Sequence, residues 1–254
     1  MESTNQILLE NIQNSISEVV PKKKIGIAFS GGVDSTLVSK ICTDMGFDVV
    51  LLTIGFSESH DIIFSKEVNE FLNYSHHVLE IDPETFPKIT TDIHKVIDTD
   101  NLSWNENCIA FHYVSKLAKS LNLDVVITGN GIDELFCGYN SYREAIEKGE
   151  DEVVKMMNDK LKNEKEMMVA INAVTAEFGV TMIQPFLLPN FIEYAKKIPV
   201  SEKLHGPDDM QRKHSIRELA VDYGIPEVAA KKQKKALQYG SQIHKSLLKS
   251  RKTS

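Results

Sequence analysis

Little in this sequence points outside the cytoplasm. Its three cysteines are odd in number and widely spaced, which is typical of reduced intracellular thiols and argues against a disulfide framework. No apolar run approaches the roughly 20 residues that a membrane-spanning helix needs, and the polar N-terminus lacks the pattern of a secretory signal. The eight histidines show no zinc-binding spacing. We therefore expect a cytoplasmic protein, with no membrane partner, that folds around an ordinary apolar core.

Charge is unevenly distributed along the chain. The formal net charge is −7, yet residues 201–254 carry twelve Lys or Arg and six Asp or Glu, a net +6, which leaves −13 for residues 1–200. A basic end on an acidic body suggests that this end contacts phosphates. A solvated lysine-rich tail is the alternative, which we favour for residues 245–254. The acidic body, without interleaved basic and aromatic residues, argues against a nucleic-acid partner.

Apolar periodicity predicts alternating strands and helices over residues 1–140. The run Val49–Ile54 has no polar alternation, which indicates a strand buried on both faces and hence a parallel sheet. We expect strands at 25–29, 49–54, 78–81 and 124–128, and helices at 5–19, 35–45, 62–72, 86–97 and 107–121. The pattern predicts a doubly wound α/β sheet in residues 1–140. Residues 141–254 have helical spacing and no convincing strand, so we expect a mostly helical C-terminal part.

The loop Ser30–Ser35 stands between the first expected strand and its helix. A helix N-terminus offers unpaired N–H groups and the positive end of the helix dipole, which together bind anions. The two glycines let the backbone approach an oxyanion closely. Asp34 would repel a phosphate unless a divalent cation lies between them, so it predicts Mg²⁺. The residues expected to contact phosphate are Ser30, Gly31, Gly32, Val33, Asp34, Ser35 and Thr36.

Two other interpretations of this loop lose support. An ordinary Gly-Gly turn capped by serine does not explain why Asp34 and Ser35 follow at the start of a helix. The loop matches neither G-x-x-x-x-G-K-[ST] nor G-x-G-x-x-G, which argues against P-loop and dinucleotide-binding proteins.

The run SGGVDS at 30–35 resembles the pyrophosphate-binding loop of the ATP pyrophosphatase superfamily, which includes GMP, NAD, argininosuccinate and asparagine synthetases. In that superfamily the loop holds the β- and γ-phosphates of ATP while the α-phosphorus is transferred to a substrate oxygen. The resemblance implies ATP and Mg²⁺ as cofactors. It also implies that the end of the second strand, at Leu52, Thr53 and Ile54, meets adenine.

The run Thr128–Tyr139 (TGNGIDELFCGY) resembles the SGEGxDELFGGY segment of asparagine synthetases and the related β-lactam synthetases. Its glycines, Gly129 among them, keep the backbone close to a ligand at the carboxyl end of the fourth strand, so Thr128 and Gly129 join the expected nucleotide site. Asp133 comes from a different strand than Asp34, and we expect the two to hold Mg²⁺ together. Acidic residues also favour the first turn of a helix, and both roles can hold for Asp133.

Weaker resemblances follow in the C-terminal part. Gln184–Leu188 is similar to the PFLD segment of asparagine synthetases, and Lys213–Arg217 to their K-x-x-L-R segment, whose lysine stabilises the adenylating transition state and the departing pyrophosphate. The run 231–241 falls where that family has a basic stretch near the phosphates, which implies roles for Lys232 and Lys234. The C-terminal part would therefore contribute basic residues to the site, and the resemblance spans about residues 22–242.

Three departures limit what the resemblance implies. The family's glutamate, thought to take the proton from the attacking nitrogen, is Asn130 here, and an amide cannot act as that base; Glu134 and Glu106 are the remaining carboxylates that could replace it. The acid- and arginine-bearing run before PFLD becomes Thr181 and Ile183, and its final Asp becomes Leu188. We also expect no preceding glutaminase domain, since residue 2 is not the cysteine that such a domain needs.

The resemblance thus implies an AMP-forming, Mg²⁺-dependent amide ligase of asparagine synthetase type. A carboxylate would attack the α-phosphorus, and an amine would resolve the acyl-adenylate, with Lys213, Asp34, Asp133 and the Asn130 position at the reacting centre. Nitrogen would come from free ammonia, a separate glutaminase or an amine on the substrate, and such synthetases often pair as homodimers. The alternatives are a tRNA-modifying enzyme that adenylates a base and a non-catalytic ATP-binding subunit.

Overall fold

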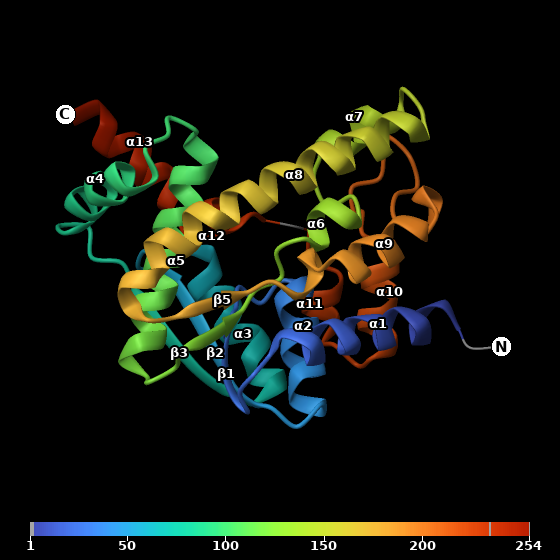
Figure 1. The fold of residues 1–254 in the computed structure, drawn as a ribbon, viewed down its shortest axis with the longest axis horizontal. Coiled ribbons are helices and arrows are strands. Elements are labelled where there is room, and N and C mark those ends of the chain that lie inside the picture. The colour runs from blue at the N-terminus through green and yellow to red at the C-terminus, as the bar shows by residue number, and fades with distance from the viewer. Residues whose placement is uncertain (1–2, 234, 254) are drawn as a thin grey trace.

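Five parallel strands form the sheet at the centre of the fold. The computed structural model describes residues 3–233 and 235–253. The strands lie in the order β3-β2-β1-β4-β5 (Figure 1). Their bounds are β1 Lys24–Ala28, β2 Asp48–Gly55, β3 Ser75–Glu80, β4 Val125–Ile127 and β5 Thr181–Ile183. The predicted α/β class with a parallel sheet is therefore confirmed.

The fifth strand corrects one expectation. We predicted no strand beyond residue 140, yet β5 pairs in parallel with β4, with Val125 opposite Thr181. Three residues are too few to show a periodicity, which is why the sequence pattern conceals this strand. Because β5 belongs to the expected helical part, the sheet takes strands from both sides of residue 140, and the division there stays a prediction.

Helices cover both faces of the sheet. The five expected helices of the first half are all present, with α5 beginning earlier than predicted, at Leu102. Helix α8, the long helix of Figure 1, runs from α7 to α5 and packs on both. The α-helices are α1 Thr4–Val19, α2 Val33–Asp44, α3 His60–Leu72, α4 Phe86–Ile97, α5 Leu102–Ser120, α6 Ile132–Leu135, α7 Ser141–Ile146, α8 Glu150–Thr175, α9 Pro189–Lys197, α10 His214–Asp222, α11 Glu227–Ala230, α12 Leu237–Gly240 and α13 Ile243–Thr253. Three short 3-10 helices lie at Ala176–Phe178, Pro185–Leu187 and Val200–Glu202.

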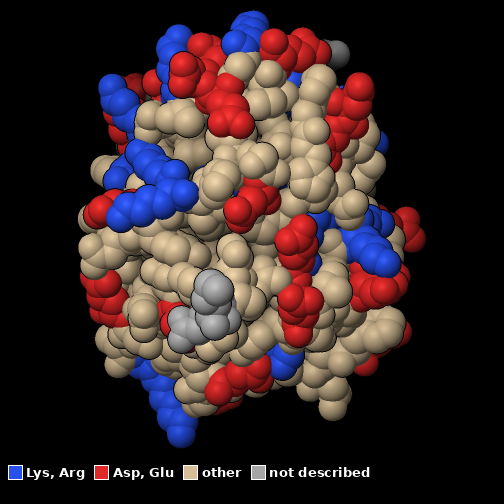
Figure 2. Space-filling model, turned by 90° about the vertical axis from the view of Figure 1, so that its right-hand side faces the viewer, with Lys and Arg blue, Asp and Glu red and all other residues tan. Residues whose placement is uncertain are grey.

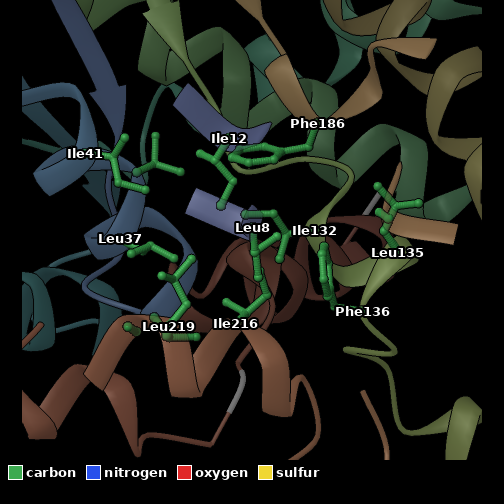
Figure 3. Close-up of a cluster of buried hydrophobic side chains, with 14 of the residues drawn as sticks. Leu8, Ile12, Leu37, Ile41, Ile132, Leu135, Phe136, Phe186, Ile216 and Leu219 are labelled. Carbon is green, nitrogen blue, oxygen red and sulfur yellow. The ribbon is translucent and has the colours of Figure 1, made fainter. Parts of the chain in front are cut away.

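Alternate residues along a strand belong to two different apolar clusters, one on each face of the sheet. Leu51 belongs to one cluster and its neighbours Val50 and Leu52 to the other, because successive side chains of a strand point to opposite faces. Figure 3 shows part of the first cluster, where Leu8 of α1 and Ile216 of α10 lie together. Segments near both ends of the chain therefore pack in one core on this face of the sheet.

The surface mixes charges of both signs. On the face drawn in Figure 2, Lys and Arg are interspersed with Asp and Glu among uncharged residues. Within the described part of the chain, no helix has the length and apolar character that crossing a bilayer requires. The three cysteines, Cys42, Cys108 and Cys137, are buried and carry free thiols.

Candidate active site

A cavity of about 320 Å³ opens at the carboxyl ends of the strands. Its wall includes Ala28 at the end of β1, Ile54 at the end of β2 and Thr128 just after β4. The chain passes from β1 to β2 on one side and later to β4 on the other, so the order of strands reverses between β1 and β4. Open α/β sheets bind ligands at such a reversal. The C-terminal part closes the cavity with α8, the start of α10 and residues 232–233 and 235–238.

The loop after β1 is shaped for an anion. Gly31 has φ +77°, and a Cβ there would lie 3.1 Å from both the ring and the backbone oxygen of Phe64, so a side chain at this position would be strained and crowded. The N–H groups of Ser30 and Gly32 donate over 3.4 Å to serine hydroxyls within the loop. These bonds are at the long limit for hydrogen bonding, so both donors are weakly held. A phosphate oxygen at the N-terminus of α2 would offer them a stronger acceptor.

The predicted loop residues divide into two groups. Ser30, Gly32, Val33, Asp34 and Ser35 line the cavity, whereas Gly31 and Thr36 do not. The Thr36 side chain is fully buried, and its hydroxyl donates to the Gly32 carbonyl over 2.8 Å.

The residues at the end of β2 that were expected to meet adenine also differ in whether they line the cavity. Leu52 and Ile54 line the cavity, but Thr53 does not. The Thr53 hydroxyl donates to the Phe29 carbonyl over 2.7 Å and lies 2.8 Å from His76 Nε2. Burial, with the nearby Lys66, lowers the pKa of His76 to about 4, so this imidazole is neutral. Thr53 thus tethers β2 to the start of the phosphate loop, and the adenine contact expected at this strand end stays a prediction.

Three charged residues, predicted from three separate motifs, meet at the centre of the site. The ammonium of Lys213 lies 2.6 Å from Asp34 Oδ2 and 3.1 Å from Asp133 Oδ1. Lys213 is only 2% exposed, and its burial lowers its pKa against the opposing attraction of Asp34. Gly138 makes room for this arrangement, since a Cβ there would lie 1.8 Å from Asp133 Oδ1.

The backbone that delivers Lys213 is strained. Arg212 and Lys213 have φ values of 53° and 55°, in the left-handed region that non-glycine residues seldom occupy. Each such residue costs on the order of 1–3 kcal/mol and persists only where the surroundings hold it. Here Arg212 Nε donates to the Gly138 carbonyl over 3.1 Å, which ties the lysine loop to the segment that carries Asp133. Strain of this kind clusters at functional sites.

Asp34 and Asp133 fit a divalent cation. A single ammonium nitrogen lies within hydrogen-bond distance of both carboxylates, so the two converge on one point. The other oxygen of Asp34 is buried and has no hydrogen-bond partner among the described residues. Carboxylate oxygens are the protein ligands that Mg²⁺ prefers. The donor set and its convergence therefore suit Mg²⁺.

Further cations surround this end of the cavity. Arg217 is 5% exposed, lines the cavity and donates to backbone carbonyls of Arg212 and Ala230, while its Nη2 has no hydrogen-bond partner among the described residues. Lys232 also lines the cavity, with its ammonium 4.5 Å from the ring centre of Phe64. Lys234, predicted to contact phosphate, lies outside the described residues. A buried guanidinium with a spare donor is suited to phosphate oxygens.

Asn130 also lines the cavity and contacts a buried acid. Its amide nitrogen donates to Glu164 Oε1 over 2.6 Å. Glu164 is on α8 and is 4% exposed, and burial raises its pKa despite that hydrogen bond. Glu134 lies on the same wall; burial and the charge of Glu164 raise its pKa to about 7. Its oxygens accept from Tyr139 Oη and from the Gly131 N–H.

Sequence reasoning missed Glu164 but had a signal for it. Val153, Met157, Leu161, Glu164 and Met168 follow one another at helical spacing, and all are buried. An acid within an otherwise apolar stripe indicates a buried carboxylate, which needs a hydrogen-bond partner. Of the two acids proposed in place of the family glutamate, Glu134 lines the cavity. Glu106 is not on the cavity wall and lies 2.5 Å from His244 Nδ1.

Comparisons with known proteins agree with these motifs. The family model described as asparagine synthase matches residues 8–177 and 148–252. "Putative asparagine synthetase (glutamine-hydrolyzing) 1" of Methanocaldococcus jannaschii is 29% identical over 280 residues, covering 98% of this chain and 51% of that protein. The asparagine synthetase (glutamine-hydrolyzing) of Asparagus officinalis is 27% identical, covering 76% of this chain and 34% of its own length. The chain thus spans about half or less of these relatives.

A solved structure shares the fold. The structure of NMN synthetase from Francisella tularensis superposes with a TM-score of 0.51 and 15% identity, covering 94% of this chain and 78% of that one. At this identity the likeness concerns the arrangement of the sheet and its helices alone.

Proposed function

This chain belongs to the asparagine synthase family, and we propose that it is a Mg²⁺- and ATP-dependent, AMP-forming amide ligase. The observation that carries the proposal is the meeting of Lys213, Asp34 and Asp133 beside an anion-binding loop. The helix N-terminus and the lysine supply positive charge for a triphosphate, and the two carboxylates supply ligands for its metal. The substrates would be ATP, a carboxylate and an amine or ammonia, the last supplied free or by a separate glutaminase.

The phosphate end of the cavity would serve adenylation. The loop N–H groups would bind the terminal phosphates, and Asp34 and Asp133 would hold Mg²⁺, which when bound neutralises phosphate charge. A substrate carboxylate oxygen attacks the α-phosphorus, the α–β bridging bond breaks and pyrophosphate leaves. Lys213 is buried, so its charge acts in a water-poor site where it stabilises the transition state most strongly.

The buried acids of the cavity wall would serve amide formation. The amine nitrogen attacks the acyl carbon, the C–N bond forms, and the bond to AMP breaks. We assign the proton that leaves the nitrogen to Glu164. Its Oε1 lies 2.6 Å from the amide nitrogen of Asn130, the residue that stands where the family has its glutamate. Its raised pKa suits a base that works near neutral pH. Asn130 would then orient the base instead of acting as one.

The two alternatives lack a supporting observation. An RNA-modifying enzyme would need a continuous basic surface, and the face drawn in Figure 2 does not provide one, because it mixes acidic and basic residues. A non-catalytic subunit would not need a buried acid beside the Asn130 position.

Pyrophosphate exchange into ATP tests the proposal. We expect exchange with at least one carboxylate in a screen of amino acids and other small acids, and a loss of roughly 10²- to 10³-fold in Asp34→Asn and Lys213→Ala. Lys197→Ala is the matched control, since Lys197 is exposed and pairs only locally with Glu193. Exchange at full rate in both site variants would refute the assignment, as would its absence with every acid in the screen.

A further inference from the structure

A second cluster of chemically active side chains lies on the loop that delivers Lys213. The ligand atoms of His205, Asp209 and His214 all lie within 4.8 Å of one another. None of the three lines the ATP cavity described above. Their spacing along the chain fits no common zinc motif, which is why the sequence did not indicate a site here. The fold of the loop brings them together.

The carboxylate at the centre of the cluster is firmly held. Asp209 Oδ1 accepts the N–H groups of Gln211 and Arg212, both over 2.9 Å, and Oδ2 accepts the N–H of His205 over 3.0 Å. Burial alone would raise the pKa of Asp209, but these bonds and that of His214 outweigh it and lower the pKa to about 2. The acid is therefore ionised and preoriented, as outer hydrogen bonds orient ligands in metal sites.

The two imidazoles are unusually close. Their ring centres lie 3.5 Å apart with an angle of 9° between the planes, and His214 Nε2 lies 2.7 Å from Asp209 Oδ2. Face-to-face stacking is a poor geometry for two aromatic rings, and two imidazolium cations would repel each other in it. The ligand atoms of the three side chains already lie within 4.8 Å of one another, and a shared cation requires the exposed His205 ring to turn out of the stack toward Asp209.

We propose that His205, Asp209 and His214 bind a divalent transition metal of the zinc class. Imidazole nitrogen with carboxylate oxygen selects zinc over magnesium. Zinc bonds to nitrogen and oxygen measure about 2.0–2.2 Å, so two ligands of a tetrahedral site lie roughly 3.3–3.6 Å apart. A metal that replaces the proton between His214 and Asp209 would therefore widen their 2.7 Å separation to that range. That proton is released to solvent, and a water completes the coordination.

A metal bound at this cluster would stabilise the loop that carries Lys213. His214 directly follows Lys213 and begins α10, while Asp209 holds the Arg212 N–H. A metal at the cluster would therefore fasten both ends of the strained segment that places the lysine. This site does not depend on the proposed ligase activity, since its donors lie outside the ATP cavity.

Zinc binding by the whole chain, after removal of metals by a chelator, is the test. We expect one zinc per chain by calorimetry and the visible absorption of tetrahedral cobalt when Co²⁺ replaces it. His205→Ala should weaken zinc binding at least tenfold, and because His205 is exposed the variant keeps its fold. His214→Gln, which retains a donor for Asp209, should lose the site as well. His77→Ala, an exposed histidine on β3, is the matched control and should bind as the unaltered chain does.

Two results would overturn the proposal. Equal zinc affinity in His205→Ala and the unaltered chain would remove His205 from any site. Zinc held by the carboxylates of the ATP cavity would instead be lost in Asp34→Asn and retained in both histidine variants.

Discussion

Replacing Glu164 by glutamine separates the two half-reactions of the proposed ligase. Glutamine has the same shape and keeps an oxygen that can accept the Asn130 amide, now at 2.6 Å from Glu164. The change therefore removes basicity while leaving the wall of the cavity in place. Adenylation, which the proposal assigns to Lys213, Asp34 and Asp133, should change little. Amide formation should fall by roughly 10²- to 10⁴-fold, the usual contribution of a general base, which is about 3–5 kcal/mol in activation free energy.

The assay measures pyrophosphate exchange and amide product on the same preparations. Burial raises the pKa of Glu164, so its basic form is populated only above the ordinary range of a carboxylate. Amide formation in the unaltered chain should rise with pH through that raised pKa, and Glu164→Gln should lose this rise. Glu166→Gln, an exposed acid on the same helix, is the matched control. An equal loss of both half-reactions, or undiminished amide formation, would refute the assignment of the base.

Other consequences follow from individual side chains. Gly31→Ala forces a left-handed alanine against Phe64 and should cost about 1–2 kcal/mol of stability and weaken ATP binding, which denaturant unfolding and nucleotide titration measure. The pKa of Glu134 is raised to about 7 in the fold. The stability that its protonated form contributes is therefore present below its ordinary pKa and should be lost as pH rises to about 7. In Glu134→Gln this part of the pH dependence of unfolding should vanish. Lys213→Ala leaves Asp34 without its cation, so Mg²⁺ should raise the melting temperature of this variant more than that of the unaltered chain.

The strands and the phosphate loop could be predicted because their signals are local. The loop Ser30–Ser35 combines glycines, hydroxyls and an acid within a few residues, and the buried strand before it shows a continuous apolar run. The strand β5 gave no such signal, because three residues that complete a sheet edge owe their conformation to the neighbouring β4. Here tertiary pairing, not local propensity, decides the structure.

The cavity wall required knowledge of side-chain direction. Thr53 stands between Leu52 and Ile54, and alternation along a strand sends it to the opposite face from both. This outcome could have been predicted from the sequence, because Leu52, Thr53 and Ile54 cannot all face one ligand when they follow one another along a strand. Glu164 was harder to predict, because Asn130 and Glu164 are 34 positions apart and meet only in the fold, where α8 packs against α6. No spacing rule links residues on separate elements.

The charges at the phosphate end make the metal and the lysine interdependent in the proposed reaction. The carboxylates of Asp34 and Asp133 are 20% and 17% exposed, so leaving them together without a cation would be costly. A divalent ion on these oxygens would repel the Lys213 ammonium that lies against them, while the phosphates that arrive with it would attract that ammonium. The same binding event that seats the metal would thus turn the lysine toward the α-phosphate. Because Lys213 is only 2% exposed, the packing around its side chain limits how far the ammonium can move, which keeps it near both partners.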